Sequence, residues 1–473
     1  MESLDLAAPM ASGEGRYKTI LRLALPTVFA MLSQSIVNEI DVVFFSRLPC
    51  PDSSNAQAAL LPSLIIVWLF GGSLSAISVG TQALVARRYA EGHRYAAGAV
   101  LANAVAFTAV GGLLLSVLGL ACLPSLVHSM IKVPEVQEVA LAYSRWRLFG
   151  VISMGATMAI KAFFDGVGKT HVHLVAALVM NAINVLLCWT FVFGHFGAPA
   201  LGAPGAGLAA FLATWIGLLI MVGYAALVRS EYRPVRLENA SRALTWSILK
   251  LSVPAAAATV VMMIGFGLFA TIVGDLDAST ATAAPAGQCG AAEAVNSAAN
   301  TDIVEILKLT FTACLSFGTA TATLIGQSLG RRQPEEARRW GWASVRLGAI
   351  IFGVVGLCEG VLFTGDIVRF ISNSAAVRAA AMFPMHIMGI VTPIIAVAMI
   401  LSEGLFGAGS TKFVAGAQFL LVFAWLVPGA YVLGVHFHLS LDGIWISAFV
   451  YACLAAVVMS VKFWRGGWQA IKL

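Results

Sequence analysis

Three polar residues fall on one face of the first long apolar stretch of this 473-residue chain. Gln34, Asn38 and Asp41 are spaced i, i+4 and i+7, which places them on one side of a helix. An ionisable residue deep in such a helix costs about 2.5–3.5 kcal/mol to insert and is expected to face a partner or water. Asn181 and Asn184, one turn apart in a later apolar stretch, would complete an oxygen-rich cage with Asp41.

This constellation suits a coupling ion. Carboxylate, amide and backbone oxygens are the ligands that hard cations prefer, whereas a lone carboxylate in a dry site holds a proton near neutral pH. We therefore predict H⁺ or Na⁺ at Asp41, with Asn184, Asn181 and Asn38 around it, and no other metal or cofactor. The alternative is that Asp41 simply lies near external water, since Arg47 follows six residues later.

A second group lies in the second half of the chain. Glu305 and Lys308 are three residues apart on one predicted helix, close enough to form an ion pair. As a neutralised pair they are a tolerable structural feature. The functional alternative is that they line a substrate cleft together with Gln34 and exchange partners with the substrate or a proton.

The remaining ionisable residues of the apolar stretches are weaker candidates. Lys161 and Asp165, at i and i+4, are predicted to form a solvated surface pair. Glu359 and Glu403 are weaker candidates than Glu305 and Lys308, and Glu403 is expected at a solvated cytoplasmic edge. The sequence therefore places its main candidate site at Asp41.

The elements that must position these residues are membrane helices. Hydrophobic residues make up 59% of the chain and charged residues 11%, against about a quarter charged in soluble domains. Each apolar stretch is long enough to cross a bilayer, for which about 20 residues suffice, and strand-like alternation is absent. We predict an all-α integral membrane protein with twelve transmembrane helices: about 20–46, 58–86, 96–123, 139–164, 170–193, 205–228, 247–274, 298–328, 341–364, 380–406, 412–434 and 443–464.

The chain contains an internal duplication. Three short motifs recur in the same order, at offsets of 228, 241 and 238 residues. A duplicated hydrophobic unit with a site between the copies is typical of secondary transporters. The recurring pairs are Leu23–Pro26 with Leu251–Pro254, Gly166–Thr170 with Gly407–Thr411, and Gly205–Phe211 with Gly443–Phe449.

The duplication divides the chain into two six-helix bundles. We predict an N-terminal tail over residues 1–20, a first bundle over 21–228, a linker over 229–246 and a second bundle over 247–473. Pro26 and Pro254 occupy matching places, where proline is tolerated at a helix start. The alternative is that both prolines are points of bending.

The distribution of basic residues predicts the orientation. All but seven of the 29 Lys and Arg residues, that is 22, fall on the side that holds both termini, which is the positive-inside pattern of a cytoplasmic face. The formal net charge of +6 therefore reflects topology and not a nucleic-acid surface, because the arginines occur in small groups separated by whole spans. We expect both termini in the cytoplasm of a bacterium and the bundles in its cytoplasmic membrane.

The seven cysteines show no metal-binding spacing. Cys50 and Cys289 fall in predicted external loops at equivalent places of the two copies. A disulfide between them would tie the halves together, but two unrelated thiols are the simpler account.

Over nearly its whole length, from about Leu21 to Trp464, the chain resembles the multidrug and toxic compound extrusion (MATE) family. The resemblance rests on the recurring motifs above, on Asp41 and Asn184, and on Gly-rich turns in a fixed order, including Leu201–Gly207 and Gly326–Gly330. It implies two bundles facing each other across a cleft and the export of solutes in exchange for Na⁺ or H⁺.

The chain departs from the family pattern at two positions. Members with a cation site in the first bundle carry Asp or Asn four residues after Asn184 and a Thr early in the sixth span. This chain has Cys188 and Ala210 there. These differences weaken the expectation of a full Na⁺ cage and favour protons.

The leading prediction is an antiporter that exports organic, cationic or amphiphilic solutes by alternating access, as a monomer in the lipid bilayer. The alternative within the superfamily is a flippase for a lipid-linked glycan or another amphiphile, which would need a strongly cationic cavity. An embedded enzyme would need a nucleophile–base pair or His-Glu-x-x-His spacing, which the sequence lacks. A channel fits two bundles with sparse buried carboxylates less well than a carrier does.

Overall fold

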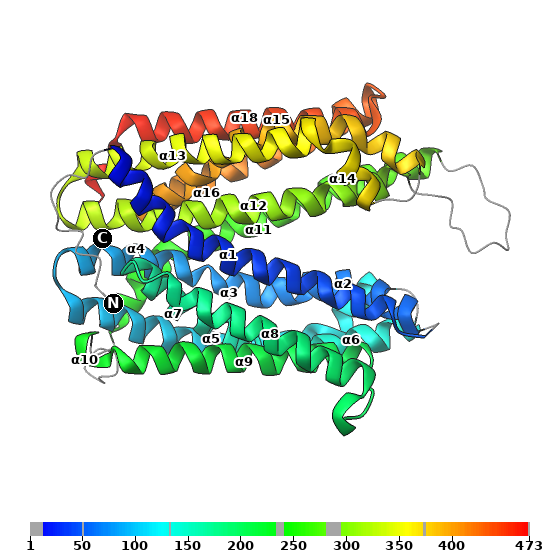
Figure 1. Cartoon of the computed structure of the whole chain (residues 1–473), viewed down its shortest axis with the longest axis horizontal. Coiled ribbons are helices and arrows are strands. Elements are labelled where there is room, and N and C mark those ends of the chain that lie inside the picture. The colour runs from blue at the N-terminus through cyan, green and yellow to red at the C-terminus, as the bar shows by residue number, and fades with distance from the viewer. Residues whose placement is uncertain are drawn as a thin grey trace.

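The computed structural model describes residues 13–49, 52–131, 134–232, 241–280, 295–371 and 375–471, and this part of the chain is almost entirely helical. The helices form two layers, one blue to green and one green to red in Figure 1. Cys50 and Cys289 lie outside the described residues, so their pairing stays a prediction.

The first half comprises six spans. They are α1 (Gly13–Ser46); α2 (Asp52–Val67) continued by α3 (Ser73–Ser75) and α4 (Ile77–Ala90); α5 (Arg94–Met130); α6 (Pro134–Phe149) with α7 (Val151–Gly166); α8 (His171–Phe193); and α9 (Ala203–Leu227).

The second half repeats this arrangement. A short α10 (Arg229–Tyr232) precedes α11 (Arg242–Thr280), α12 (Val295–Gly330), α13 (Pro334–Leu357), α14 (Thr364–Ile371) and α15 (Ala375–Gly407). The last spans are α16 (Thr411–Leu421) continued by α17 (Val427–Tyr431), and α18 (Ser440–Arg465). The predicted linker, 229–246, thus contains α10 and the start of α11, and the domain boundaries stay a prediction.

Within the described ranges, ten helical segments are long and apolar enough to cross a membrane. The pair α6 and α7, bent by 42° around Gly150, makes an eleventh. The 34-residue α1 has the length for a twelfth. The predicted fold class, an all-α membrane protein of twelve spans in two bundles, is confirmed.

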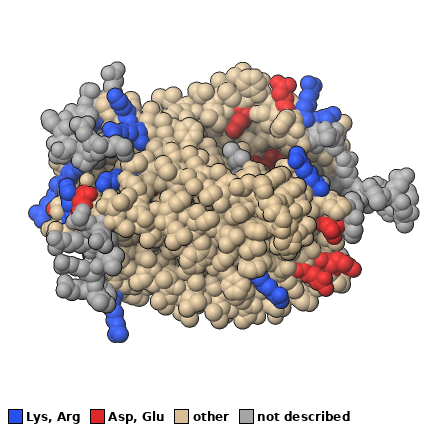
Figure 2. All heavy atoms as spheres, turned by 60° about the horizontal axis from the view of Figure 1, so that its bottom comes forward, with Lys and Arg blue, Asp and Glu red and all other residues tan. Residues whose placement is uncertain are grey.

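Charged side chains mark two ends of the molecule. On the face in Figure 2, blue and red residues lie toward the ends and a broad uncharged zone lies between them. The start of α1 and the end of α18 lie at one end (Figure 1), which we call the basic end. Such a zone suits the hydrocarbon core of a bilayer.

The turns at the basic end repeat between the halves. The Lys169 amide donates to the Phe164 carbonyl at 2.8 Å, and the Ser410 amide donates to the Leu405 carbonyl at 2.8 Å, 241 residues later. Gly168 and Gly409 adopt φ of +84° and +88°, a conformation that favours glycine at helix C-termini. The recurring Gly motifs therefore encode two equivalent helix ends.

Helix α1 packs into the cores of both halves. Ile20, Leu23 and Ala24 near its start belong to a buried cluster of the second half. Phe45, near its end, packs with residues of α6, α8 and α9 in the first half. The helix that carries Asp41 therefore crosses from one half to the other.

Pro26 lies in this crossing helix, thirteen residues after its first residue, and Pro254 lies twelve residues into α11. The expectation that these prolines start their helices is wrong, because both helices extend toward the basic end beyond the apolar stretches. A proline inside a helix removes one backbone hydrogen bond and favours bending. Pro26 thus lies between Leu23, which packs in the second half, and Asp41.

Hydrogen bonds join the two halves near the basic end. The Gln82 Nε2 of α4 donates to the Thr319 carbonyl at 2.9 Å and to the Thr323 Oγ1 at 2.8 Å. The Gln327 Nε2 of α12 donates to the Gly166 carbonyl at 2.8 Å. Toward the opposite end the surface is hollowed, with acidic side chains visible in the hollow (Figure 2).

Removing Gln82 and Gln327 tests the importance of these bonds. Gln82→Ala with Gln327→Ala deletes three hydrogen bonds, each worth about 1 kcal/mol. We expect the population closed at the basic end to fall by roughly 30- to 150-fold relative to the open one. The measurement is the distance distribution between spin labels at His93 and Arg332, on the basic-end turns of the two halves.

A matched control uses another glutamine. The Nε2 of the half-buried Gln469 donates to the Pro334 carbonyl within the second half at 3.1 Å. Gln469→Ala is therefore expected to leave the distances unchanged. An unchanged distribution in the Gln82 and Gln327 variant would show that these bonds do not set the closed state.

Candidate functional site

The carboxylate of Asp41 is buried where α1 meets α6 and α8. The Tyr143 hydroxyl of α6 donates to its Oδ2 at 3.5 Å, and the Cys188 thiol of α8 faces its Oδ1 at 3.5 Å. Hydrogen bonds from a hydroxyl to a carboxylate are usually 2.5–2.7 Å long. These loose contacts leave the carboxylate able to take a further partner.

The two asparagines of α8 have different partners. Asn184 is buried, and its Oδ1 lies 3.8 Å from the Cys188 sulfur. The structure therefore connects Asn184 with Asp41 through the Cys188 thiol. Asn181 instead donates to the Ser33 hydroxyl of α1 at 2.8 Å, and its own Oδ1 is buried without a hydrogen bond from the described residues.

Two further residues of the predicted set lie on α1. Gln34 is half-buried, and the side chain of Asn38 lies outside the described part of the chain. The predicted cage is thus represented by Asp41 and Asn184. Asn181 lies beside the cage, on a separate hydrogen bond.

Two residues that the sequence analysis did not place at the site come from α6. Arg147 interacts electrostatically with Asp41, and its guanidinium lies over the Tyr143 ring, 5.8 Å from the centroid. Tyr143 is fully enclosed. The signal available in the sequence was their i, i+4 spacing, which puts both side chains on one face of α6.

The donor set at Asp41 suits a proton better than a metal ion. Hard cations take several oxygen ligands, but here a thiol stands next to the carboxylate and a guanidinium supplies positive charge. Among the described residues, no group of three or more His, Cys, Asp or Glu side chains is arranged to hold a metal ion. The carboxylate can exchange its interaction with Arg147 for a proton.

The pair predicted in the second half forms on α12. The Lys308 Nζ lies 2.6 Å from the Glu305 Oε2, and the two side chains are 40% and 46% exposed. An ion pair this open contributes about 0–1 kcal/mol. The predicted part of the pair in the substrate cleft stays a prediction.

Glu359 is better enclosed than the sequence indicates. It lies in a π-helical turn, Cys358–Leu362, and its Oε1 accepts a hydrogen bond from the Thr310 hydroxyl at 3.0 Å. Its Oε2 is buried without a partner among the described residues. Since π-helical turns often mark functional positions, Glu359 is the stronger carboxylate candidate of the second half.

The pair of Lys161 and Asp165 is not on the surface, and that expectation is wrong. The Nζ and Oδ2 atoms are 2.7 Å apart, with side chains 9% and 1% exposed. The pair is buried because α12 covers it, and the Thr323 hydroxyl of α12 donates to the Asp165 carbonyl at 2.9 Å. Glu403 of α15, half-buried, interacts electrostatically with Lys161 and so is not a solvated edge residue.

Comparisons with known proteins agree with this architecture. The family model MatE matches residues 26–190 and 294–432. The "Probable multidrug resistance protein NorM" of Thermotoga maritima is 23% identical over 464 residues, covering 96% of this chain and 93% of the relative. The "Multidrug resistance protein MdtK" of Yersinia enterocolitica is 23% identical, with 94% of both chains covered.

A similar solved structure is titled "Outward-facing conformation of a multidrug resistance MATE family transporter of the MOP superfamily". It superposes with a TM-score of 0.84 at 20% identity, covering 95% of this chain and 96% of that chain. The named relatives are multidrug resistance proteins and not enzymes.

Proposed function

Since this chain is a member of the MATE family of transporters, we propose that it is a secondary active antiporter that exports organic cations or amphiphiles in exchange for protons. The relatives named as multidrug resistance proteins support a broad range of solutes. We place it as a monomer in a bacterial cytoplasmic membrane, with the basic end inside, as the distribution of Lys and Arg favours.

The observation that carries this proposal is the buried carboxylate of Asp41 on a helix packed in both halves. An ionisable side chain in a membrane helix marks an ion or substrate path by default. Because α1 spans the boundary between the halves, a charge change at Asp41 acts on the element that joins them. This is the coupling that alternating access requires.

The proposed cycle follows from the neighbours of Asp41. With the basic end closed, a proton from the opposite side binds the Asp41 carboxylate and removes its charge. The interaction with Arg147 weakens, as does the attraction for a cationic solute. The solute leaves, the halves rearrange about α1, and the proton leaves at the basic end.

Protons are favoured over Na⁺ by the residues around Asp41. Cys188 stands where a second oxygen ligand would complete a cage, and Arg147 opposes a second positive charge. A Na⁺ ion would need more oxygen ligands than this arrangement supplies. Tyr143 contacts the carboxylate directly, and Asn184 is connected to it through the Cys188 thiol.

The test is efflux of a fluorescent organic cation from proteoliposomes with an imposed pH gradient or an imposed Na⁺ gradient. The proposal expects transport driven by the pH gradient and indifferent to Na⁺. Transport driven by the Na⁺ gradient alone would show that Na⁺, and not the proton, is the coupling ion. Transport that ignores both gradients would favour a flippase.

A further inference from the structure

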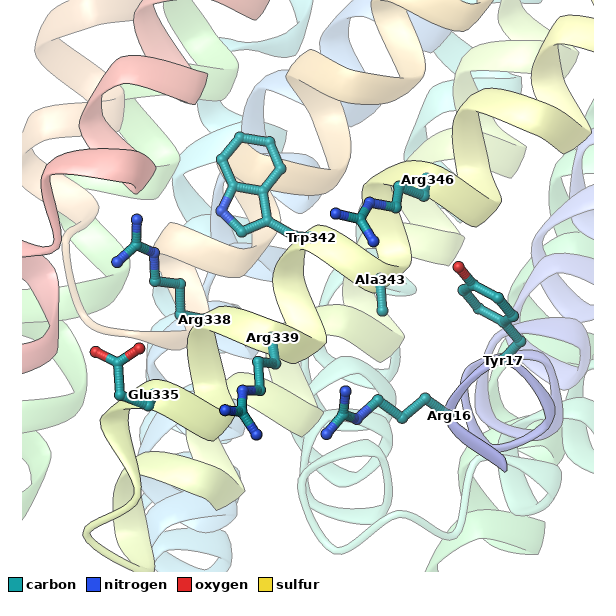
Figure 3. A pocket seen from close by; sticks show the side chains of 8 residues that line it. All are labelled: Arg16, Tyr17, Glu335, Arg338, Arg339, Trp342, Ala343 and Arg346. Atoms are coloured by element: carbon teal, nitrogen blue, oxygen red, sulfur yellow. The ribbon is translucent and has the colours of Figure 1, made fainter. Parts of the chain in front are cut away.

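A pocket lined by arginines lies where the two halves meet at the basic end. It has a volume of about 300 Å³. Figure 3 shows two side chains from the start of α1 facing a row of side chains from α13. The lining residues are Arg16, Tyr17, Glu335, Arg338, Arg339, Trp342, Ala343 and Arg346.

The pocket is strongly cationic. Four arginines and one glutamate line it, for a formal charge of +3 (4 − 1). Arg16 pairs with Glu336 across the halves at 3.1 Å, and Arg339 approaches the same carboxylate at 3.7 Å. The contacts that describe Arg338 and Arg346 include no carboxylate partner, so these two guanidinium groups are available to an anion.

The position of Arg346 points to a lipid. It is twelve residues into α13, about 18 Å along a helix that spans the membrane, and it is exposed. An exposed arginine on a membrane-spanning helix favours an anionic or polar partner. Arg338, Trp342 and Arg346 are spaced i, i+4 and i+8, so two cations flank an aromatic ring on one face, as at membrane interfaces.

The duplication shows that the arginines are an addition to the fold. The turn before α5 and the turn before α13 carry equivalent hydrogen bonds, from His93 to Arg88 and from Gln333 to Ser328, at an offset of 240 residues. At that offset none of the three arginines of α13 has a basic counterpart. The counterparts of Arg338, Arg339 and Arg346 are Gly98, Ala99 and Ala106.

We propose that this pocket binds the phosphate of an anionic phospholipid headgroup from the leaflet at the basic end. Guanidinium groups bind phosphate oxygens with paired N–H donors, and basic pockets between membrane helices bind anionic headgroups. The lipid chains lie against the apolar surface of α13, where Ile350 and Val354 are exposed. The occupied site would connect the start of α1 to α13.

The test measures lipid binding and is independent of transport. The purified full-length chain is titrated with phosphatidylglycerol, and bound lipid is counted by native mass spectrometry, with phosphatidylcholine as the zwitterionic comparison. We expect Arg338→Gln with Arg346→Gln to weaken phosphatidylglycerol binding roughly thirtyfold. Phosphatidylcholine binding is expected to stay within about twofold of wild type, because its headgroup carries no net charge.

A matched control removes two other cations at the same end. Arg242 and Lys250 are exposed on α11 and are also eight residues apart. Arg242→Gln with Lys250→Gln is expected to bind phosphatidylglycerol within about twofold of wild type, since both side chains are exposed on one helix. Equal losses in both double variants would overturn the proposal, because they would reflect net charge alone.

Inorganic phosphate separates the two sources of the anion. If excess inorganic phosphate displaces little of the bound phosphatidylglycerol, the result supports the lipid site. If inorganic phosphate binds tightly and phosphatidylglycerol is not preferred, the pocket is a site for free phosphate, and the proposal of a lipid site is refuted. Elution volume and melting temperature equal to those of wild type establish that both double variants are folded.

Discussion

Replacing Asp41 with asparagine is expected to lower efflux driven by a pH gradient by about a hundredfold, to the level of empty liposomes. The substitution keeps the size of the side chain and one oxygen that can accept a hydrogen bond, where Asp41 presents two oxygens to the Tyr143 hydroxyl and the Cys188 thiol. It removes the charge that a proton neutralises and that Arg147 balances. Loss of one partner from a buried charge interaction costs about 2–5 kcal/mol, which corresponds to a hundredfold or more in a coupled equilibrium.

The measurement is the initial rate of efflux in proteoliposomes, with protein content matched between preparations. Glu231→Gln is the control, because Glu231 is also a carboxylate paired with a cation, Arg94, but is partly exposed and lies on α10, outside the candidate site. The control is expected to transport within about twofold of wild type, as for other exposed ion pairs. Wild-type rates for Asp41→Asn, or equal losses in both variants, would refute Asp41 as the coupling residue.

The sequence predicts the architecture of this protein well because the signals are local. Apolar stretches of membrane-spanning length identify the helices, and the Gly motifs identify helix ends. Gly168 and Gly409 adopt the left-handed conformation that the turn at a helix C-terminus requires. The predicted spans begin at 20 and 247, whereas α1 begins at Gly13 and α11 at Arg242, because polar turns outside the bilayer carry no hydropathy signal.

The site is less predictable because it depends on how helices pack. Helical spacing correctly puts Asn181 and Asn184 on one face of α8, but it does not fix the register between α8 and α1. In the register that the structure has, Asn181 donates a hydrogen bond to Ser33, and Asn184 lies beside the Cys188 thiol, which contacts Asp41. Arg147 reaches Asp41 from a third helix, α6. No pattern within α6 encodes that approach.

Lys161 and Asp165 show the same limit for burial. Their i, i+4 spacing predicts the ion pair, and the structure contains it at 2.7 Å. Their environment comes from the other half of the chain, where Thr323 bonds the Asp165 carbonyl and Glu403 acts on Lys161. The local sequence therefore does not distinguish a surface pair from a buried pair, although breaking the buried pair costs much more stability.

This difference makes a strong prediction for stability. Lys161→Met leaves the Asp165 carboxylate buried without its cation, and its Oδ1 already has no hydrogen bond from the described residues. Breaking a buried pair in this way costs about 3–5 kcal/mol. At about 2 °C per kcal/mol, the melting temperature in detergent is expected to fall by about 6–10 °C.

Two comparison variants distinguish the buried pair from a surface pair. Lys161→Met with Asp165→Leu replaces both charges by apolar groups of similar volume, which is often neutral or stabilising, so the melting temperature should return to near that of wild type. Arg94→Gln breaks an ion pair of the same kind with Glu231, at 3.0 Å but with side chains 55% and 31% exposed. It should change the free energy of unfolding by less than about 1 kcal/mol. If Lys161→Met melts no lower than Arg94→Gln, the pair is solvated and α12 does not seal the basic end over it.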